Sequence, residues 1–173
     1  MQLIYYFCVF GELIFNKKRT ALTRTVADED LPPVSVVIAT KNEEYYLKDK
    51  LAFFLEQDYP EFEVIVVNDA STDESEYILK AFSKIYPNLK VVNIVENVNK
   101  FRGKKFPISL GIKSTKYEHL VLSCADCEPR GFNWLRNIAS RFDSKHEIVL
   151  GFGSFAKRKG IFNALLQYDN VTT

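Results

Sequence analysis

Cysteine is scarce in this sequence, with three among 173 residues, and one of them, Cys8, lies in an apolar N-terminal segment. A small, odd number of cysteines argues against a secreted domain held together by disulfides, so we expect a reducing compartment. Charge of one sign is also lacking, because 23 basic residues face 22 acidic ones. This balance excludes a general polyanion-binding surface, and we expect no nucleic-acid partner. The composition, 47% hydrophobic and 26% charged without a low-complexity tract, is typical of one globular domain.

The sequence also lacks an apolar run of the roughly 20 residues that a membrane-spanning helix needs. Residues 1–15 are nonetheless almost entirely aromatic and aliphatic, and Lys17-Lys18-Arg19 follows them. This segment has neither the basic start nor the cleavage site of a signal peptide, so we interpret it as an interfacial helix or the stub of a membrane span. The basic triplet would place the following domain on the cytoplasmic side of a membrane. A terminal helix packed on the domain is the alternative interpretation.

The rest of the chain divides into a polar segment and one domain. Residues 16–33 are charged and polar and end in Pro32-Pro33, so we expect a linker there and a domain over 34–173. Runs of Val, Ile and Leu then alternate with helical periodicity, which predicts an α/β fold with a Rossmann-like, mostly parallel sheet and helices on both faces. Strands are predicted at residues 34–39, 63–68, 89–95, 119–123 and near 147–152, and helices at residues 42–57, 73–86 and 104–114 and around Leu135, Ile138 and Phe142.

The first two predicted helices carry further local signals. Each is preceded by the spacing of a capping box, Thr40-x-x-Glu43 and Ser71-x-x-Glu74, in which nearby side chains accept the first N–H groups of the helix. Their apolar residues recur at helical spacing, which predicts that one face of each helix is buried. These inward residues are Leu47, Leu51, Phe54 and Leu55 in the first helix, and Ile78, Phe82 and Ile85 in the second.

Acidic groups follow two of the predicted strands at their carboxyl ends. Asn68-Asp69-Ala70-Ser71-Thr72-Asp73 follows the apolar run 64–67, and Cys124-Ala125-Asp126 follows Leu120-Val121-Leu122. Open α/β sheets bind their ligands at the carboxyl ends of their strands. Two carboxylate-bearing strand ends therefore indicate a nucleotide and metal site.

Four segments together resemble the N-terminal, nucleotide-binding half of the family 2 glycosyltransferases, which have the GT-A fold. They are 34–44, 67–73, 103–105 with Gly111, and 123–129. The resemblance implies inverting transfer from a nucleotide-diphosphate sugar, with a UDP-type donor favoured, to a glycan or lipid acceptor in cell-envelope polysaccharide synthesis. It also implies that Asp69 accepts a hydrogen bond from the base and that Glu43 and the turn Ala39 to Lys41 line the nucleoside.

Elementary chemistry supports these roles for Asp69 and Lys104. A fixed carboxylate can accept the N–H of uracil, and a diphosphate needs a cation, either a lysine or a hard metal ion held by carboxylates. Lys104 opens a predicted helix, whose N-terminus favours phosphate. The alternative for Lys104 is a solvated lysine, and the alternative for Asp69 is turn chemistry. For Asp73 we expect helix capping alone.

The sequence departs from the family pattern at the expected metal site. The resemblance implies an Asp-x-Asp pair that holds a divalent ion against the phosphates, and Asp126 matches its second member, whereas Cys124 stands at the first. A thiol is a poor ligand for Mg²⁺ or Mn²⁺, so we expect Asp126 to hold either ion weakly. We expect Glu128 to be exposed rather than to compensate.

Other functions remain open at this point. Cys124 and Cys127 form a C-x-x-C pair that could be redox-active, and His119 and His146 could complete a zinc site with them. A non-catalytic nucleotide-binding or interaction module of the same fold is a further alternative. The acidic pair that would supply the catalytic base does not follow Asp126, so we expect that base beyond Thr173 and little or no sugar transfer by this chain alone.

Overall fold

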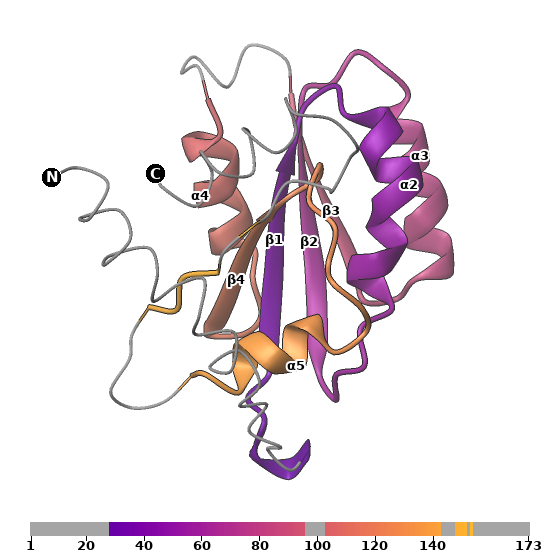
Figure 1. Cartoon of the computed structure of the whole chain (residues 1–173). Coiled ribbons are helices and arrows are strands. Elements are labelled where there is room, and N and C mark those ends of the chain that lie inside the picture. The colour runs from indigo at the N-terminus through magenta and orange to yellow at the C-terminus, as the bar shows by residue number, and fades with distance from the viewer. Residues whose placement is uncertain (1–27, 96–102, 143–147, 152, 154–173) are drawn as a thin grey trace, which may run out of the picture.

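The computed structural model describes residues 28–95, 103–142, 148–151 and 153, and the statements below concern these residues. Four strands alternate with four α-helices, and a short 3₁₀ helix precedes them (Figure 1). The elements in chain order are η2 (Asp28–Asp30), β1 (Val34–Thr40), α2 (Glu44–Leu55), β2 (Phe62–Asp69), α3 (Ser75–Ile85), β3 (Leu89–Ile94), α4 (Lys105–Lys113), β4 (His119–Cys124) and α5 (Trp134–Ala139).

The four strands form one parallel sheet in the order β3-β2-β1-β4. Helices α2 and α3 lie on one face of the sheet and α4 lies on the other (Figure 1). The predicted α/β fold, with a parallel sheet covered on both faces, is therefore confirmed. In the register of the sheet, Thr40 of β1 pairs with Asn68 of β2, and Ala39 of β1 pairs with Cys124 of β4. The carboxyl ends of β2 and β4, which carry the predicted acidic groups, thus lie on either side of β1 at one edge of the sheet.

The apolar residues of β1 and β2 are buried on both faces of the sheet, which explains why these strands lack the alternation of a half-exposed strand. Val36, Ile38 and Val66 belong to the core that α2, α3 and α5 cover. Val37 and Val67 belong to a second, smaller core, to which α4 contributes Phe106 and Leu110. The side chains of a strand alternate between these two cores because its side-chain period is two.

Helix α2 buries the predicted residues Leu47, Leu51, Phe54 and Leu55, so its inward face is confirmed. Helix α3 buries Ile78 and packs Phe82 against the same core, but Ile85 is 70% exposed, and that part of the prediction is wrong. The buried stripe of α3 instead includes Leu79 and continues to Tyr86, whose ring stacks on Phe82 with centroids 5.8 Å apart. Ile85, in the last turn of α3, is not among the described residues that form or pack against either core.

Residues before β1 and after β4 pack on the domain as well. Leu31 is part of the core, and Arg136 of α5 forms an ion pair with Asp28, so the folded unit begins at least at Asp28, within the segment expected to be a linker. Gln57 holds the start of α5: its Oε1 accepts the N–H of Leu135 at 2.9 Å, and its Nε2 donates to the carbonyl of Gly131 at 3.1 Å.

The predicted fifth strand near residues 147–152 is wrong for residues 148–151, which form no strand in the structure. Residues 147 and 152 lie outside the described residues. Ile148 and Leu150 are 78% and 91% exposed. A strand needs a neighbour for its backbone hydrogen bonds, and within the described ranges none pairs with this apolar run.

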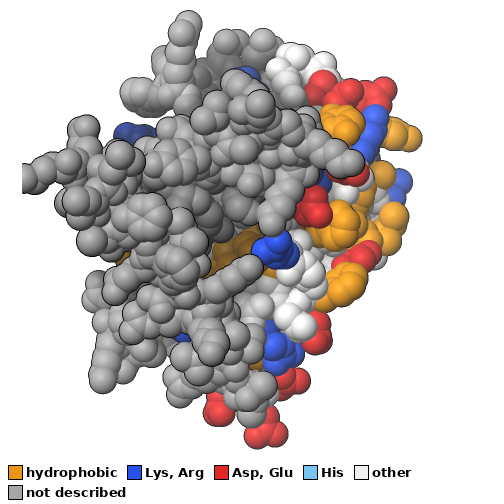
Figure 2. Space-filling view, viewed as in Figure 1, with side chains coloured by type: hydrophobic (Ala, Val, Ile, Leu, Met, Phe, Trp, Pro, Cys, Tyr) orange, Lys and Arg blue, Asp and Glu red, His pale blue; other side chains and the backbone are white. Residues whose placement is uncertain are grey.

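Two expectations about partners concern the surface and the N-terminus. Acidic and basic side chains are mixed over α2 and α3, and no patch of one sign stands out there (Figure 2). Among the described residues, no helix is both long and apolar enough to span a bilayer. The segment 1–15, on which we based the expectation of membrane association, lies outside those residues.

Gly111 allows α4 to approach the sheet closely. A Cβ atom built on Gly111 would lie 2.5 Å from Cγ1 of Val37 and 3.0 Å from Cγ2 of Val67, distances at which side chains must shift. Because valine has a stiff χ1 angle, it yields less readily than a longer side chain. The missing side chain of Gly111 therefore sets the separation between α4 and the sheet, and with it the position of Lys104 just before the helix.

We predict that Gly111→Ala lowers the free energy of unfolding by about 1–2 kcal/mol, because overpacking outweighs the better helix propensity of alanine. Gly111→Val should cost more, and Ser109→Ala, on the exposed side of the same helix, should change stability by less than about 0.5 kcal/mol. Urea denaturation followed by circular dichroism measures all three. Equal stabilities of Gly111→Ala and Ser109→Ala would contradict the close approach.

Candidate nucleotide-binding site

The loops that follow β1 and β2 both turn sharply at a residue with positive φ. Asn42 has φ 53° and Ala70 has φ 48°. Asparagine tolerates this left-handed conformation, but for alanine it costs about 1–2 kcal/mol, so the surrounding contacts must hold Ala70 in place. The sequence patterns did not indicate either conformation.

Reciprocal hydrogen bonds join these two loops. The backbone N–H of Asn42 donates to Oγ of Ser71 at 2.9 Å, and the backbone N–H of Thr72 donates to Oδ1 of Asn42 at 2.8 Å. Asn68 at the end of β2 supports the second loop, because its Oδ1 accepts the N–H of Ser71 at 3.2 Å. The ends of β1 and β2 are therefore fixed to each other beyond the last pair of the sheet.

The helices α2 and α3 cap each other in the same way. Oδ2 of Asp73 accepts the N–H of Glu44 at 3.0 Å, and Oε2 of Glu44 accepts the N–H of Glu74 at 2.9 Å. The capping boxes predicted at Thr40 to Glu43 and at Ser71 to Glu74 are wrong, because neither N-cap residue makes a side-chain cap. Capping as the role of Asp73 agrees with the structure, since its Oδ1 also accepts the N–H of Ser75 at 3.0 Å.

Asp73 carries its charge more readily than an ordinary aspartate. Burial tends to raise the pKa of the Asp73 carboxyl, but hydrogen bonds from Ser75 and Glu44 outweigh burial and hold this pKa below its usual value. The ionised carboxylate is therefore part of the folded structure. Its contribution to stability is present above about pH 4 and is lost as the pH falls through the lowered pKa.

Asp69, Ala39 and Cys124 share one face of the sheet at its carboxyl edge. Asp69 lies two residues beyond Val67 and Ala39 two residues beyond Val37, so both point to the face that α4 covers, and Cys124 pairs with Ala39. Asp69 is only 7% exposed, and Nζ of Lys41 lies 3.7 Å from its Oδ2. A buried carboxylate next to one lysine thus stands at the end of the second strand.

Glu43 and Lys104 meet near the same edge. Nζ of Lys104, which directly precedes α4, lies 3.5 Å from Oε1 of Glu43, and the Lys104 side chain is 47% exposed. Oε2 of Glu43 is buried and makes no hydrogen bond within the described part of the chain. Lys104 can therefore contact solvent or a ligand while it remains paired with Glu43.

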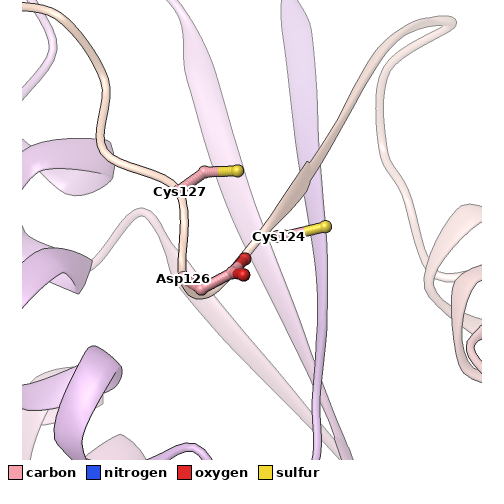
Figure 3. A group of neighbouring side chains, drawn as sticks. All are labelled: Cys124, Asp126 and Cys127. Atoms are coloured by element: carbon pink, nitrogen blue, oxygen red, sulfur yellow. The ribbon is translucent and has the colours of Figure 1, made fainter. Parts of the chain in front are cut away.

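Cys124, Asp126 and Cys127 lie in the turn after β4 (Figure 3). Their potential ligand atoms all lie within 4.8 Å of one another. Nζ of Lys50 donates to the carbonyl of Asp126 at 2.5 Å, which ties this turn to α2. Burial raises the pKa of the Cys124 thiol, and the charge of Lys104 only partly opposes this effect. The expected exposure of Glu128 agrees with the structure.

The structure disfavours a redox-active cysteine pair and excludes His119 from a zinc site with the cysteines. A redox-active pair needs a thiolate, and the raised pKa of Cys124 disfavours that form. The zinc site that included His119 is wrong, because His119 begins β4 and stacks on Phe142 with ring centroids 5.3 Å apart. Cys124 ends the same strand, roughly 16 Å away at about 3.3 Å per residue. His146 lies outside the described residues.

The structure thus brings the predicted residues to one edge of the sheet, and it adds residues that the sequence did not indicate. The predicted residues are Ala39, Lys41, Glu43, Asp69, Lys104, Cys124 and Asp126. The added ones are Asn42, Glu44 and Ser71, which lock the loops, and Lys50, which holds the third turn. No sequence signal marks these contacts, because each joins residues at least 29 positions apart.

The fold places candidate site residues at the carboxyl ends of β1, β2 and β4 in an open, parallel α/β sheet, and such sheets bind their ligands at the carboxyl ends of their strands. Comparison with known proteins then gives the family. The model of Glycosyl transferase family 2 matches residues 35–167, and the chain belongs to this family.

Curated relatives include the poly-beta-1,6-N-acetyl-D-glucosamine synthase of Staphylococcus epidermidis, 33% identical over 71% of this chain and 28% of that protein. The poly(ribitol-phosphate) beta-N-acetylglucosaminyltransferase TarS of Staphylococcus aureus is 31% identical over 73% of this chain and 21% of its own length. The chain therefore spans less than a third of the length of either relative.

Two solved structures resemble the domain. TarS 1–349 in complex with UDP-GlcNAc matches with a TM-score of 0.54 and 31% identity, over 62% of this chain and 30% of that one. The mannosyltransferase PcManGT from Pyrobaculum calidifontis, in complex with GDP-Man and Mn²⁺, matches with a TM-score of 0.58 and 27% identity, over 79% of this chain and 41% of that one. Both neighbours hold a nucleotide sugar in their solved structures.

We predict that Asp73→Ala lowers the free energy of unfolding by about 1–2 kcal/mol at pH 7, because the first N–H groups of α2 and α3 lose their acceptor. Between pH 6 and pH 3 the wild-type chain should lose more stability than the variant, since only the wild type loses the charged cap. Denaturant unfolding at several pH values measures both effects. The exposed Asp49 of α2, replaced by Ala, is the matched control, and the same loss there would contradict a specific role for Asp73.

Proposed function

We propose that this chain is the donor-binding part of an inverting glycosyltransferase that takes a UDP-sugar and extends a cell-envelope glycan. The observation that carries the proposal is the buried Asp69 at the end of β2, on the sheet face that α4 covers and near which Lys104 directly precedes α4. The family membership of the chain and the UDP-GlcNAc complex of TarS support it. The names of both curated relatives specify an N-acetylglucosamine product or transfer, which favours a UDP-linked amino sugar as the donor.

In this proposal each residue acts through a contact that its position permits. Asp69 accepts the imide N–H of uracil, Glu43 and the turn from Ala39 to Lys41 line the nucleoside, and Lys104 faces the diphosphate. The rigid loops place these groups before the donor arrives, which lowers the entropic cost of binding. Transfer itself needs an acceptor-side base, which we do not assign to any described residue.

The metal that the family implies does not fit this chain well. Mg²⁺ and Mn²⁺ prefer oxygen ligands, and the cluster after β4 offers one carboxylate, Asp126, beside two sulfur atoms. We propose that Lys104, with Lys41 nearby, supplies most of the positive charge toward the diphosphate, and that Asp126 holds a hard ion only weakly. We further propose that residues 1–15 associate with a membrane and place this domain on its cytoplasmic side.

We predict that the chain binds UDP more tightly than CDP, because N3 of uracil carries an N–H that can donate to Asp69, whereas N3 of cytosine is an acceptor. Asp69→Ala should weaken UDP binding roughly 10- to 150-fold, which corresponds to about 1.5–3 kcal/mol for a charged hydrogen bond. The affinity for CDP should change little. Calorimetry with both nucleotides measures these values, with Asp49→Ala as the control and thermal melting as the check of folding. Equal loss for UDP and CDP would contradict base recognition by Asp69.

We predict that Lys104→Ala weakens UDP binding roughly fivefold and leaves uridine binding unchanged, because only the diphosphate gains from the lysine. The effect is modest since a half-exposed charge is screened by solvent. Lys105→Ala, which removes the adjacent exposed lysine, is the matched control and should lose much less. If both variants lose the same affinity for UDP, Lys104 contributes only through the net charge of the chain and not through a specific contact.

A further inference from the structure

The turn after β4 gathers two thiols and a carboxylate in a space that a single ion can bridge. The backbone N–H of Cys127 donates to the carbonyl of Cys124 at 3.1 Å, which closes the turn and brings the two cysteines together. Asp126 lies between them, and the three side chains extend to the same side of the turn (Figure 3). No two of their ligand atoms are more than 4.8 Å apart.

This spacing is close to that of a tetrahedral zinc site. With metal–ligand distances of about 2.0–2.3 Å, neighbouring ligand atoms in such a site lie roughly 3.3–3.8 Å apart. The separations here exceed that range by no more than about 1 Å. Asp126 and Cys127 are exposed and can change rotamer at little cost, so the site can close on an ion without a shift of β4.

The chemistry of the donors selects the kind of ion. Sulfur is a poor ligand for Mg²⁺ and Mn²⁺ and a good one for Zn²⁺ and similar soft or borderline cations. We propose that Cys124, Asp126 and Cys127 form a binding site for a thiophilic divalent cation of the Zn²⁺ class, in preference to Mg²⁺ or Mn²⁺. The site shares an edge of the sheet with the proposed nucleotide site, but the inference goes beyond the proposed function because it does not depend on nucleotide binding.

The surroundings suit such a site. Binding replaces the two thiol protons, which pass to solvent, and leaves two thiolates and one carboxylate around the ion. The ammonium of Lys50, hydrogen bonded to the carbonyl of Asp126, lies beside this negative cluster. Three protein ligands leave one position open for water or a ligand oxygen, as in many reactive zinc sites.

The site would also change the charge that a donor phosphate meets. Two carboxylates neutralise a divalent ion, whereas two thiolates and one carboxylate leave the ion and its ligands with a net charge of about −1. Zinc in this site would therefore attract a diphosphate less than a hard ion between two carboxylates does. This is consistent with the larger share of phosphate binding that we propose for the lysines.

Titration with Co²⁺, a spectroscopic substitute for Zn²⁺, tests the proposal on the full chain. The protein is a Cys8→Ser variant, reduced and stripped of metal, so that Cys124 and Cys127 are its only thiols. We expect a thiolate-to-cobalt charge-transfer band in the near ultraviolet at one equivalent of Co²⁺ and its loss when one equivalent of Zn²⁺ is added. Competition with a chromogenic chelator should give an affinity for Zn²⁺ at least 100-fold above that for Mn²⁺.

Four variants locate the ion. Cys124→Ser and Cys127→Ser should each weaken Zn²⁺ binding at least tenfold, and Glu128→Gln, an exposed neighbour, should not change it. Cys124→Asp should weaken Zn²⁺ binding and strengthen Mn²⁺ binding. Circular dichroism and thermal melting check the fold of each variant, and Cys127, being exposed, is the position where replacement disturbs the fold least.

Three metal-binding results would each overturn the proposal: no charge-transfer band, Mn²⁺ bound as tightly as Zn²⁺, or unchanged Zn²⁺ affinity in the folded Cys127→Ser variant. Conversion of the reduced protein to a Cys124–Cys127 disulfide in place of metal uptake would also overturn it. UDP binding is measured separately without metal, so failure of the zinc site leaves the proposed nucleotide function standing, and the reverse also holds.

Discussion

The arrangement of this domain depends on the inner strand β1, which lies between β2 and β4 in the sheet. All seven residues of β1 are buried. A strand buried on both faces must satisfy its backbone hydrogen bonds on both edges, and β1 does so with β2 on one side and β4 on the other. Parallel pairing then forces the three carboxyl ends to the same edge of the sheet. The nucleotide site that we propose is a consequence of this constraint, because its acidic and basic groups come from the loops that leave those three ends and from the start of α4.

Sequence patterns were sufficient for the features that depend on local periodicity. Four of the predicted strands, their helices and the inward residues of α2 are found in the structure. These features could be predicted because the spacing of apolar residues shows which faces of a strand or helix are buried. The run at 148–151 has the same local composition, but no strand of the described part of the chain pairs with it, so composition alone gave the wrong result there.

The site was less accessible to sequence reasoning, because its precision depends on contacts between distant segments. The side chain that caps α2 is Asp73, which lies 29 residues beyond the N–H of Glu44 that it accepts. No capping pattern spans such a distance, and the local patterns at Thr40 and Ser71 therefore pointed to the wrong acceptors. Asp69 and Lys104 could be proposed from their positions after a strand and before a helix. Their proximity to Lys41 and Glu43 required the three-dimensional structure.

The register of the sheet has a consequence for the order in which the domain can assemble. β1 pairs with β2 and β2 with β3 across short helical connections, whereas β1 and β4 join residues about 85 positions apart, such as Val34 and His119. Loops of that length close more slowly and at a greater entropic cost than short ones. On a ribosome, β1 to β3 with α2 and α3 can form before β4 has been synthesised. The turn that carries Cys124 and Asp126 is then the last of the three strand ends to join the sheet, so the cluster of two thiols and one carboxylate is completed only after the ends of β1 and β2 have been fixed to each other.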